Sequence, residues 1–80
     1  MGEKYDVTKR IVKLVAALSE KSNGWKKELN LISWNGREPK LDIREWDPDH
    51  EKCSKGLTLS YEEAQVLCDA LSRYLQGGKA

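Results

Sequence analysis

The 80-residue chain has few of the residues that support covalent cross-linking. It contains two cysteines, Cys53 and Cys68, which are too few for a disulfide framework. No signal peptide is recognisable, so we expect both to be reduced thiols in a cytosolic protein. No apolar run approaches the roughly 20 residues that a membrane-spanning helix needs, and we expect no membrane partner.

Residues that support metal binding or catalysis are also scarce. The only histidine, His50, lies three residues before Cys53, and a pair inside one short loop lacks the long-range packing that fixes catalytic geometry. The loop over residues 47–53 does not match a calcium-binding loop, because Lys52 occupies the required glycine position. Zinc would need more Cys or His. We therefore expect a solvated turn, no enzymatic activity, no metal and no cofactor.

The small size of the chain limits the core that it can build. We expect one domain over residues 1–80, with a core over about residues 10–76 and polar termini, of which residues 1–6 are frayed. A domain of this size leaves much of its surface exposed, and oligomerisation is a common remedy. A homodimer is therefore an expectation before any motif is considered.

The chain lacks a strong excess of one charge, since its formal net charge is +1. This argues against a histone-like polycation. The charge is nevertheless segregated, because residues 1–40 hold nine Lys/Arg against five Asp/Glu, whereas residues 41–80 hold five against eight. A nucleic-acid site would have to be a local basic face, and chance is the alternative explanation.

Residues 7–20 fit two kinds of secondary structure. Apolar residues recur there at helical spacing, which favours an amphipathic helix. They are Val7, Ile11, Leu14, Val15 and Leu18. The run from residue 11 to residue 18 is also β-branched enough for a strand. Periodicity alone favours the helix.

Two strands are predicted over residues 26–34 and 40–46. The connection between them opens with Asn35-Gly36 and closes with Pro39, which makes it too long for a two-residue hairpin. Residues 40–46 alternate cleanly in polarity. In residues 26–34, Leu29 and Leu31 alternate with Asn30, while Ile32 and Trp34 fall on the Asn30 face.

The second of these segments predicts an aromatic and basic surface. Alternation along residues 40–46 points Leu41 and Ile43 toward the core. The residues between them should then share the open face of the sheet. These are Lys40, Asp42, Arg44 and Trp46.

A short strand is predicted over residues 55–59, and a helix follows it. Ser60 and Glu63 have the spacing of a capping box, which marks a helix start. The helix carries an apolar stripe of Ala64, Leu67, Cys68, Leu71, Tyr74 and Leu75. Val66 and Ala70 widen this surface, which fits either a partner helix in a homodimer or a wide core face. Gly77-Gly78 is expected to end the helix.

Three tryptophans lie among lysines and arginines around the two longer predicted strands. Indole rings stack on bases and basic side chains neutralise phosphates, so this combination favours a single-stranded nucleic-acid platform. Trp25, Trp34 and Trp46 could equally be core or interface residues. Trp46 is the ring most expected to face nucleic acid, because it shares a face with Lys40 and Arg44.

Several motifs in order resemble the positive-cofactor-four family of transcriptional coactivators. The segment Leu41-Asp42-Ile43-Arg44-Glu45-Trp46-Asp47-Pro48 is similar to the family's "I-D-I-R-E" strand and "D-P" loop. Residues 55–60, Lys-Gly-Leu-Thr-Leu-Ser, resemble its "K-G-I-S-L" step before the helix. Residues 27–36 and 49–52 look like the bacterial YdbC-type branch. The resemblance covers residues 25–72 well and residues 10–24 loosely.

The resemblance implies an α+β fold, in which a curved four-stranded antiparallel sheet is followed by one C-terminal helix. It implies a homodimer that binds single-stranded DNA with little sequence preference. Residues 10–20 then become the first strand, and we prefer this to the helix because tertiary context overrides periodicity in a short segment. Lys40, Arg44 and Trp46 match strand positions that resemble those meeting DNA in the family, and Lys55 matches its "K-G" lysine.

We therefore predict a transcription coactivator-like DNA-binding domain that is cytoplasmic, bacterial and nucleoid-associated. The alternatives are single-stranded RNA as ligand, or a protein-interaction and dimerisation module with the tryptophans buried in an interface. The predicted nucleic-acid-binding residues are Trp25, Lys26, Lys27, Asn30, Trp34, Arg37, Lys40, Arg44, Trp46 and Lys55.

Overall fold

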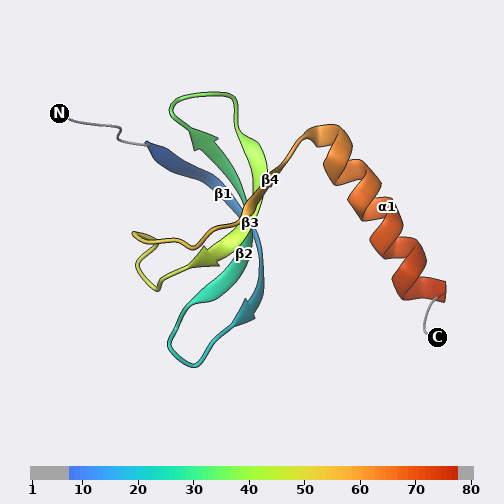
Figure 1. The fold of residues 1–80 in the computed structure, drawn as a ribbon, viewed down its shortest axis with the longest axis horizontal. Coiled ribbons are helices and arrows are strands. Elements are labelled where there is room, and N and C mark those ends of the chain that lie inside the picture. The colour runs from blue at the N-terminus through green and yellow to red at the C-terminus, as the bar shows by residue number, and fades with distance from the viewer. Residues whose placement is uncertain (1–7, 78–80) are drawn as a thin grey trace.

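A computed structural model describes residues 8–77. Four antiparallel strands form one open sheet in the order β1-β2-β3-β4, and one helix follows them. The elements are β1 (Lys9–Glu20), β2 (Lys26–Trp34), β3 (Lys40–Trp46), β4 (Leu57–Leu59) and α1 (Tyr61–Gly77). The sheet is twisted, and the helix lies to one side of it (Figure 1). The predicted α+β fold is confirmed, and the frayed segment predicted for residues 1–6 lies outside the described residues.

The irregular pairing of the first strand explains why its sequence has a helix-like pattern. Residues 9–20 form β1, so the strand is confirmed and the amphipathic helix is wrong. The pairing of β1 with β2 shifts register between Ile11 and Lys13, between Leu14 and Ala16, and again between residues 17 and 19. Each shift adds one residue on β1, as a β-bulge does. Residues on one face therefore recur every three positions instead of every two, which imitates the period of a helix.

The two longer predicted strands begin and end as the sequence predicted, at Lys26–Trp34 and Lys40–Trp46. Their connection starts with a tight turn, in which the Arg37 N–H donates to the carbonyl of Trp34 at 2.9 Å. Asn35 and Gly36 both have positive φ, 53° and 73°. This is the backbone that a type I′ turn requires, and Asn-Gly is its preferred sequence.

The last strand is shorter than predicted, since β4 begins at Leu57 rather than at residue 55. The residue before it, Gly56, lies against β3, and a Cβ there would come within 2.3 Å of the Ile43 carbonyl oxygen.

The capping box at the start of α1 is formed in both directions. The Glu63 N–H donates to Ser60 Oγ at 3.0 Å, and the Ser60 N–H donates to Glu63 Oε1 at 2.9 Å.

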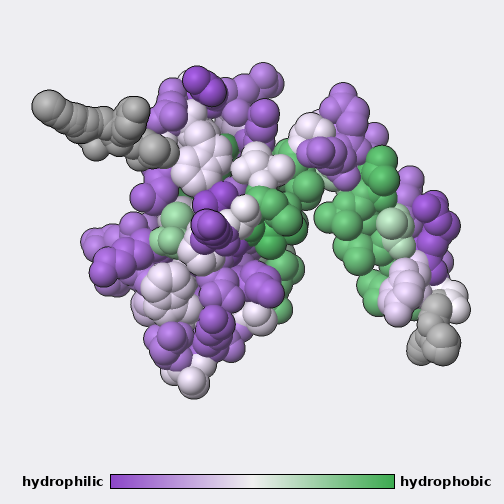
Figure 2. Space-filling view, viewed as in Figure 1, coloured by the Kyte–Doolittle hydropathy of each residue, from purple (hydrophilic) through white to green (hydrophobic). Residues whose placement is uncertain are grey.

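The buried part of the described chain is small and largely polar. Among residues 8–77 the buried apolar side chains are Ile32 and Trp46. Buried polar side chains outnumber them, and these are Glu28, Asn30, Ser33 and Asp42. No residue of α1 is buried. In Figure 2 the apolar side of the sheet and the apolar side of the helix face each other across an open space. Within residues 8–77, large apolar side chains of both β1 and α1 are thus left exposed.

Among the described residues, no helix combines the length and the hydrophobicity needed to cross a membrane.

Candidate nucleic-acid interface

One face of the sheet, which we call the polar face, combines the aromatic and ionic side chains of β2 and β3. The register pairs Lys26 with Trp46, Glu28 with Arg44, Asn30 with Asp42 and Ile32 with Lys40. Side chains two residues apart point the same way, so alternate residues of both strands share this face. The polar face therefore consists of Lys26, Glu28, Asn30, Ile32, Trp34, Lys40, Asp42, Arg44 and Trp46.

A buried carboxylate fixes the arginine of the polar face. Arg44 donates from Nε to Asp42 Oδ1 at 2.7 Å and from Nη2 to Asp42 Oδ2 at 2.8 Å. Thr58 on β4 adds a hydroxyl donor to Asp42 Oδ2 at 3.1 Å. Asp42 is fully buried, and its hydrogen bonds raise the pKa of the Arg44 guanidinium despite partial burial. Paired in this bidentate way, the guanidinium keeps one fixed orientation.

That orientation places the arginine over an indole ring. The Cζ atom of Arg44 lies 4.9 Å from the centroid of the Trp34 ring. This is cation–π geometry, and the guanidinium plane can also stack on bases. Trp34 is half-buried, so the ring and the guanidinium form a layered aromatic and cationic element on the polar face.

A second buried carboxylate binds the loop between β3 and β4. Nε2 of His50 lies 3.0 Å from each carboxylate oxygen of Glu28, and Asn30 Nδ2 donates to Glu28 Oε1 at 3.0 Å. His50 adopts a φ of 58°, and its ring lies 5.7 Å from the ring of Trp46, centroid to centroid. The loop therefore folds back over the polar face beside the last indole of β3.

This arrangement changes the expectation for Trp46. The ring was expected to be the most exposed of the three, yet its relative exposure is 1%. Strand alternation does place it on the face of Lys40 and Arg44, as predicted. The loop carrying His50 covers that position, and a sequence pattern along the strand contains no signal for a loop that folds back. Trp46 is covered in this conformation.

The other two indoles are more accessible. Trp34 is half-buried on the polar face, and Trp25 is half-buried at the end of the β1–β2 turn. The N–H of Trp25 is held by Asn23 Oδ1 at 3.0 Å, which fixes the turn. Nε1 of Trp34 and Nε1 of Trp46 are buried without a hydrogen-bond partner among the described residues.

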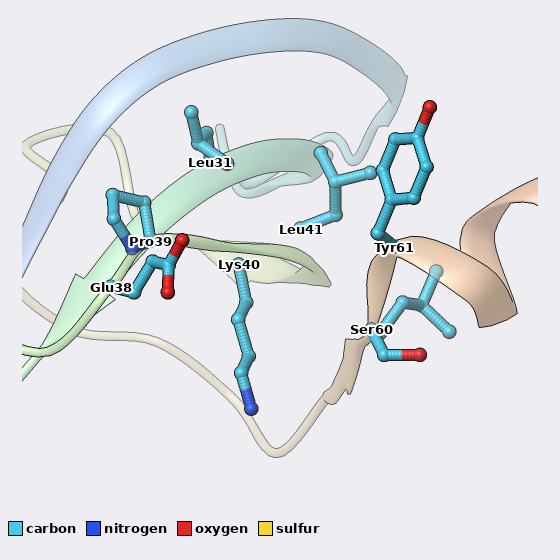
Figure 3. A pocket seen from close by; sticks show the side chains of 8 residues that line it. Leu31, Glu38, Pro39, Lys40, Leu41, Ser60 and Tyr61 are labelled. Carbon is cyan, nitrogen blue, oxygen red and sulfur yellow. The ribbon is translucent and has the colours of Figure 1, made fainter.

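The predicted basic residues do not all share one surface. Lys26 and Lys40 lie exposed on the polar face, whereas Lys27 is on the opposite face of β2. Figure 3 shows Lys40 extending away from Leu41, as alternation requires. Arg37 and Lys55 are exposed in the two loops that flank β3. Asn30 is on the polar face but has no exposed surface, and its amide serves Glu28.

Sequence reasoning missed three residues that organise this face. Glu28 and Asp42 are buried anions beside the predicted cations, and His50 is the loop residue that contacts Glu28. Alternation already put Glu28 and Asp42 on the face of Arg44, so pairing of opposite charges was the available signal. The His50 contact spans 22 residues and has no local signal.

The opposite face of the sheet and the facing side of α1 form an apolar groove of about 460 Å³. It is lined mainly by leucines, including Leu29, Leu41, Leu59, Leu67 and Leu71. A smaller hollow of about 270 Å³ continues it past Tyr61 to Leu31 (Figure 3). Leu41 and Ile43 were expected to face the core, and they are half-buried on the apolar side of the sheet, where they line this groove.

An open antiparallel sheet with stacked aromatic and cationic side chains defines a class of nucleic-acid-binding surfaces. Comparison with known families agrees with this class. Residues 21–70 match the model of the family described as Transcriptional Coactivator p15 (PC4). The chain belongs to this family, as the resemblance predicted. The family is one of non-enzymatic nucleic-acid-binding proteins, and membership indicates a coactivator-like, DNA-binding role.

A similar protein occurs in Treponema pallidum (strain Nichols), where it is described as uncharacterized. It is 47% identical to this chain over 68 residues, which cover 85% of this chain and 75% of that protein.

Proposed function

We propose that the chain binds single-stranded DNA with little sequence preference, through the polar face of its sheet. The observation that carries the proposal is the stacking of Arg44 on Trp34, with Lys26 and Lys40 exposed on the same face. An indole accepts any base, and each stacked base contributes about 1–3 kcal/mol. Stacking is tolerant of sequence because every base has a π-face. The family match supports the same ligand.

In this proposal the bases stack on Trp34, on Trp46 once it is uncovered, and on Trp25 as a third ring. Phosphates are neutralised by cations at the rim of the polar face and in the adjoining loops. These are Lys26, Arg37, Lys40, Arg44 and Lys55, whereas Lys27 lies on the opposite face of β2 and is left out. Arg44 contributes less charge than the lysines, because Asp42 already pairs with it. The setting would be transcription or DNA maintenance at a cytoplasmic nucleoid.

The direct test is a titration of labelled oligo(dT) and of a duplex of the same length. We expect the single strand to bind more tightly, with quenching of tryptophan emission. Log affinity should fall against log salt with a slope of about −0.7 for each phosphate contacted. Equal affinity for duplex, or binding without quenching, would contradict base stacking. Oligo(rU) in a parallel titration decides whether RNA is an equal ligand.

We also propose that the chain acts as a homodimer through the apolar groove. The groove contains both the uncovered sheet face and the uncovered helix face. A two-fold contact between two copies lets the helix of each chain cover the sheet of the other, so both faces are buried on both chains. The single chain leaves large apolar side chains of α1 exposed, since Leu71 is 49% exposed and Leu75 is 68% exposed.

Sedimentation equilibrium with two neighbouring helix variants tests this. Leu71→Lys places a charge in the groove, whereas Ser72→Lys adds the same charge one residue away, outside the groove lining. We expect Leu71→Lys to abolish dimers and Ser72→Lys to keep them. A parent chain that is monomeric at micromolar concentration would overturn the proposal. The rival, a protein-interaction module built on buried tryptophans, requires an interface on the polar face instead.

A further inference from the structure

The first strand extends the polar face to the edge of the sheet. The register of β1 with β2 places one β1 residue opposite each polar-face residue of β2, and directly paired residues of an antiparallel sheet point to the same side. We call these five residues of β1 the β1 strip. They are Lys9 opposite Trp34, Ile11 opposite Ile32, Leu14 opposite Asn30, Ala17 opposite Glu28 and Glu20 opposite Lys26.

The β1 strip is accessible where the neighbouring strand is covered. Asn30 and Ile32 are 0% exposed, so a ligand on the polar face does not reach the middle of β2. Leu14, by contrast, is 52% exposed, and Ala17 is exposed as well. The accessible aliphatic surface on this side of the sheet therefore lies on β1.

Charge is distributed unequally along the β1 strip. At one end Lys9 lies exposed opposite Trp34. At the other end Glu20 lies opposite Lys26 and offsets part of its charge. The Lys9 end therefore favours an anionic ligand more than the Glu20 end does.

The bulges of β1 argue against the addition of a second protein strand at this edge. An added strand needs a regular row of N–H and C=O groups. The register of β1, however, shifts three times within its 12 residues. Each bulge bends the strand and interrupts the regular ladder. A ligand at this edge is therefore expected to bind through side chains of β1 and not through its backbone.

We propose that the β1 strip is part of the nucleic-acid surface, with bases over Leu14 and Ala17 and a phosphate at Lys9. The inference rests on the proposed function and adds a third strand to it. A single-stranded nucleic acid suits the strip because its base faces pack on apolar side chains and its phosphates attract cations. A base stacked on Trp34 brings its phosphate within reach of Lys9, since directly paired side chains begin about 5 Å apart.

Acetylation of lysines with and without oligo(dT), followed by mass spectrometry, tests where the nucleic acid lies. Lys9 and Lys13 are both exposed on β1, but Lys13 pairs with Leu31 and points to the other side of the sheet. We expect oligo(dT) to cause a loss of acetylation at Lys9 and no change at Lys13. Equal protection of both lysines, or protection of neither, would overturn the inference.

A matched pair of lysine variants measures the phosphate contact. Lys9→Ala should weaken oligo(dT) binding and reduce the slope of log affinity against log salt by about 0.7, the value of one phosphate contact. Lys13→Ala removes the same charge from the other side of the sheet and should leave both quantities unchanged. Lys9→Ala and Lys13→Ala variants with the same affinity and slope would show that Lys9 binds no phosphate.

A leucine variant measures the contact with bases. Leu14→Ser should weaken oligo(dT) binding about fourfold, which corresponds to one buried CH₂ group. Sedimentation should be as in the parent, and circular dichroism should confirm the sheet. Affinity equal to that of the parent overturns the contact with bases. If that variant also loses dimers, the strip is a contact between two copies of the chain instead.

The failure of this inference can be distinguished from the failure of the proposed function. If oligo(dT) binds the parent with quenching while Lys9→Ala and Lys13→Ala bind alike, the proposed function stands and the β1 strip is excluded from the site. If oligo(dT) does not bind the parent, the proposed function is wrong and the inference is wrong with it.

Discussion

Arg44 lies over the ring of Trp34 with its Cζ 4.9 Å from the ring centroid, while two of its nitrogens are held by Asp42. One guanidinium thus connects a buried anion to an accessible indole. A lysine cannot make the same set of contacts, because its ammonium group has neither the paired N–H donors nor the planar surface of a guanidinium. The orientation of the aromatic element on the polar face is therefore set by a fully buried carboxylate.

Replacing Arg44 by lysine keeps the charge and removes this geometry. We expect Arg44→Lys to lower the free energy of unfolding by about 1.5–3 kcal/mol, the contribution of a hydrogen bond to a charged group. Urea unfolding at fixed protein concentration measures this change. Lys40→Arg is the matched control at an exposed position and should be nearly neutral. Equal stability of the parent and Arg44→Lys would show that the bidentate pair contributes nothing.

Removing the accessible indole should affect binding more than folding. Trp34→Ala is expected to weaken oligo(dT) binding by about 1–3 kcal/mol, the contribution of one stacked base. Fluorescence anisotropy with a labelled oligonucleotide measures the loss. Trp34→Phe keeps an aromatic face and should retain most of the affinity. If alanine and phenylalanine behave alike, stacking at this position does not contribute.

Gly56 should not tolerate a side chain, because a Cβ there would lie 2.3 Å from the Ile43 carbonyl oxygen and 2.3 Å from Arg44 Cβ. Gly56→Ala must push β4 away from β3, and we expect a loss of about 1–3 kcal/mol, as for overpacking. Gly77→Ala is the control, since nothing lies within 4 Å of a Cβ there. Thermal unfolding of both variants should give a clear loss for the first and no loss for the second.

The capping box of α1 should contribute measurably to stability, because none of the residues described for this helix is buried. Ser60→Ala removes the acceptor for the Glu63 N–H. We expect the free energy of unfolding to fall by about 1 kcal/mol. Ser72→Ala, in the middle of the helix and exposed, should be neutral or slightly stabilising. A loss at position 72 equal to that at position 60 would contradict a specific capping effect.

Much of the fold could be predicted because the signals are local. The alternation of residues 26–34 and 40–46 gave both strands with their bounds, and Ser60 with Glu63 gave the helix start. Residues 9–20 were harder, since three bulges turn a strand's period of two into a period near three. The β-branched run from residue 11 to residue 18 allowed a strand, and the family resemblance decided in its favour. The bulges depend on pairing with β2, which a single-segment pattern does not contain.

The sequence by itself determined which side chains share a face, because the backbone of a strand alternates regardless of what surrounds it. It therefore placed Trp46, Arg44 and Lys40 together. Only the tertiary structure decided which of them meet solvent. Trp46 is covered because His50 reaches Glu28 across 22 residues, and Arg44 is fixed because Asp42 is buried beside it. Exposure depends on what folds over a face, and that is a property of contacts between distant segments.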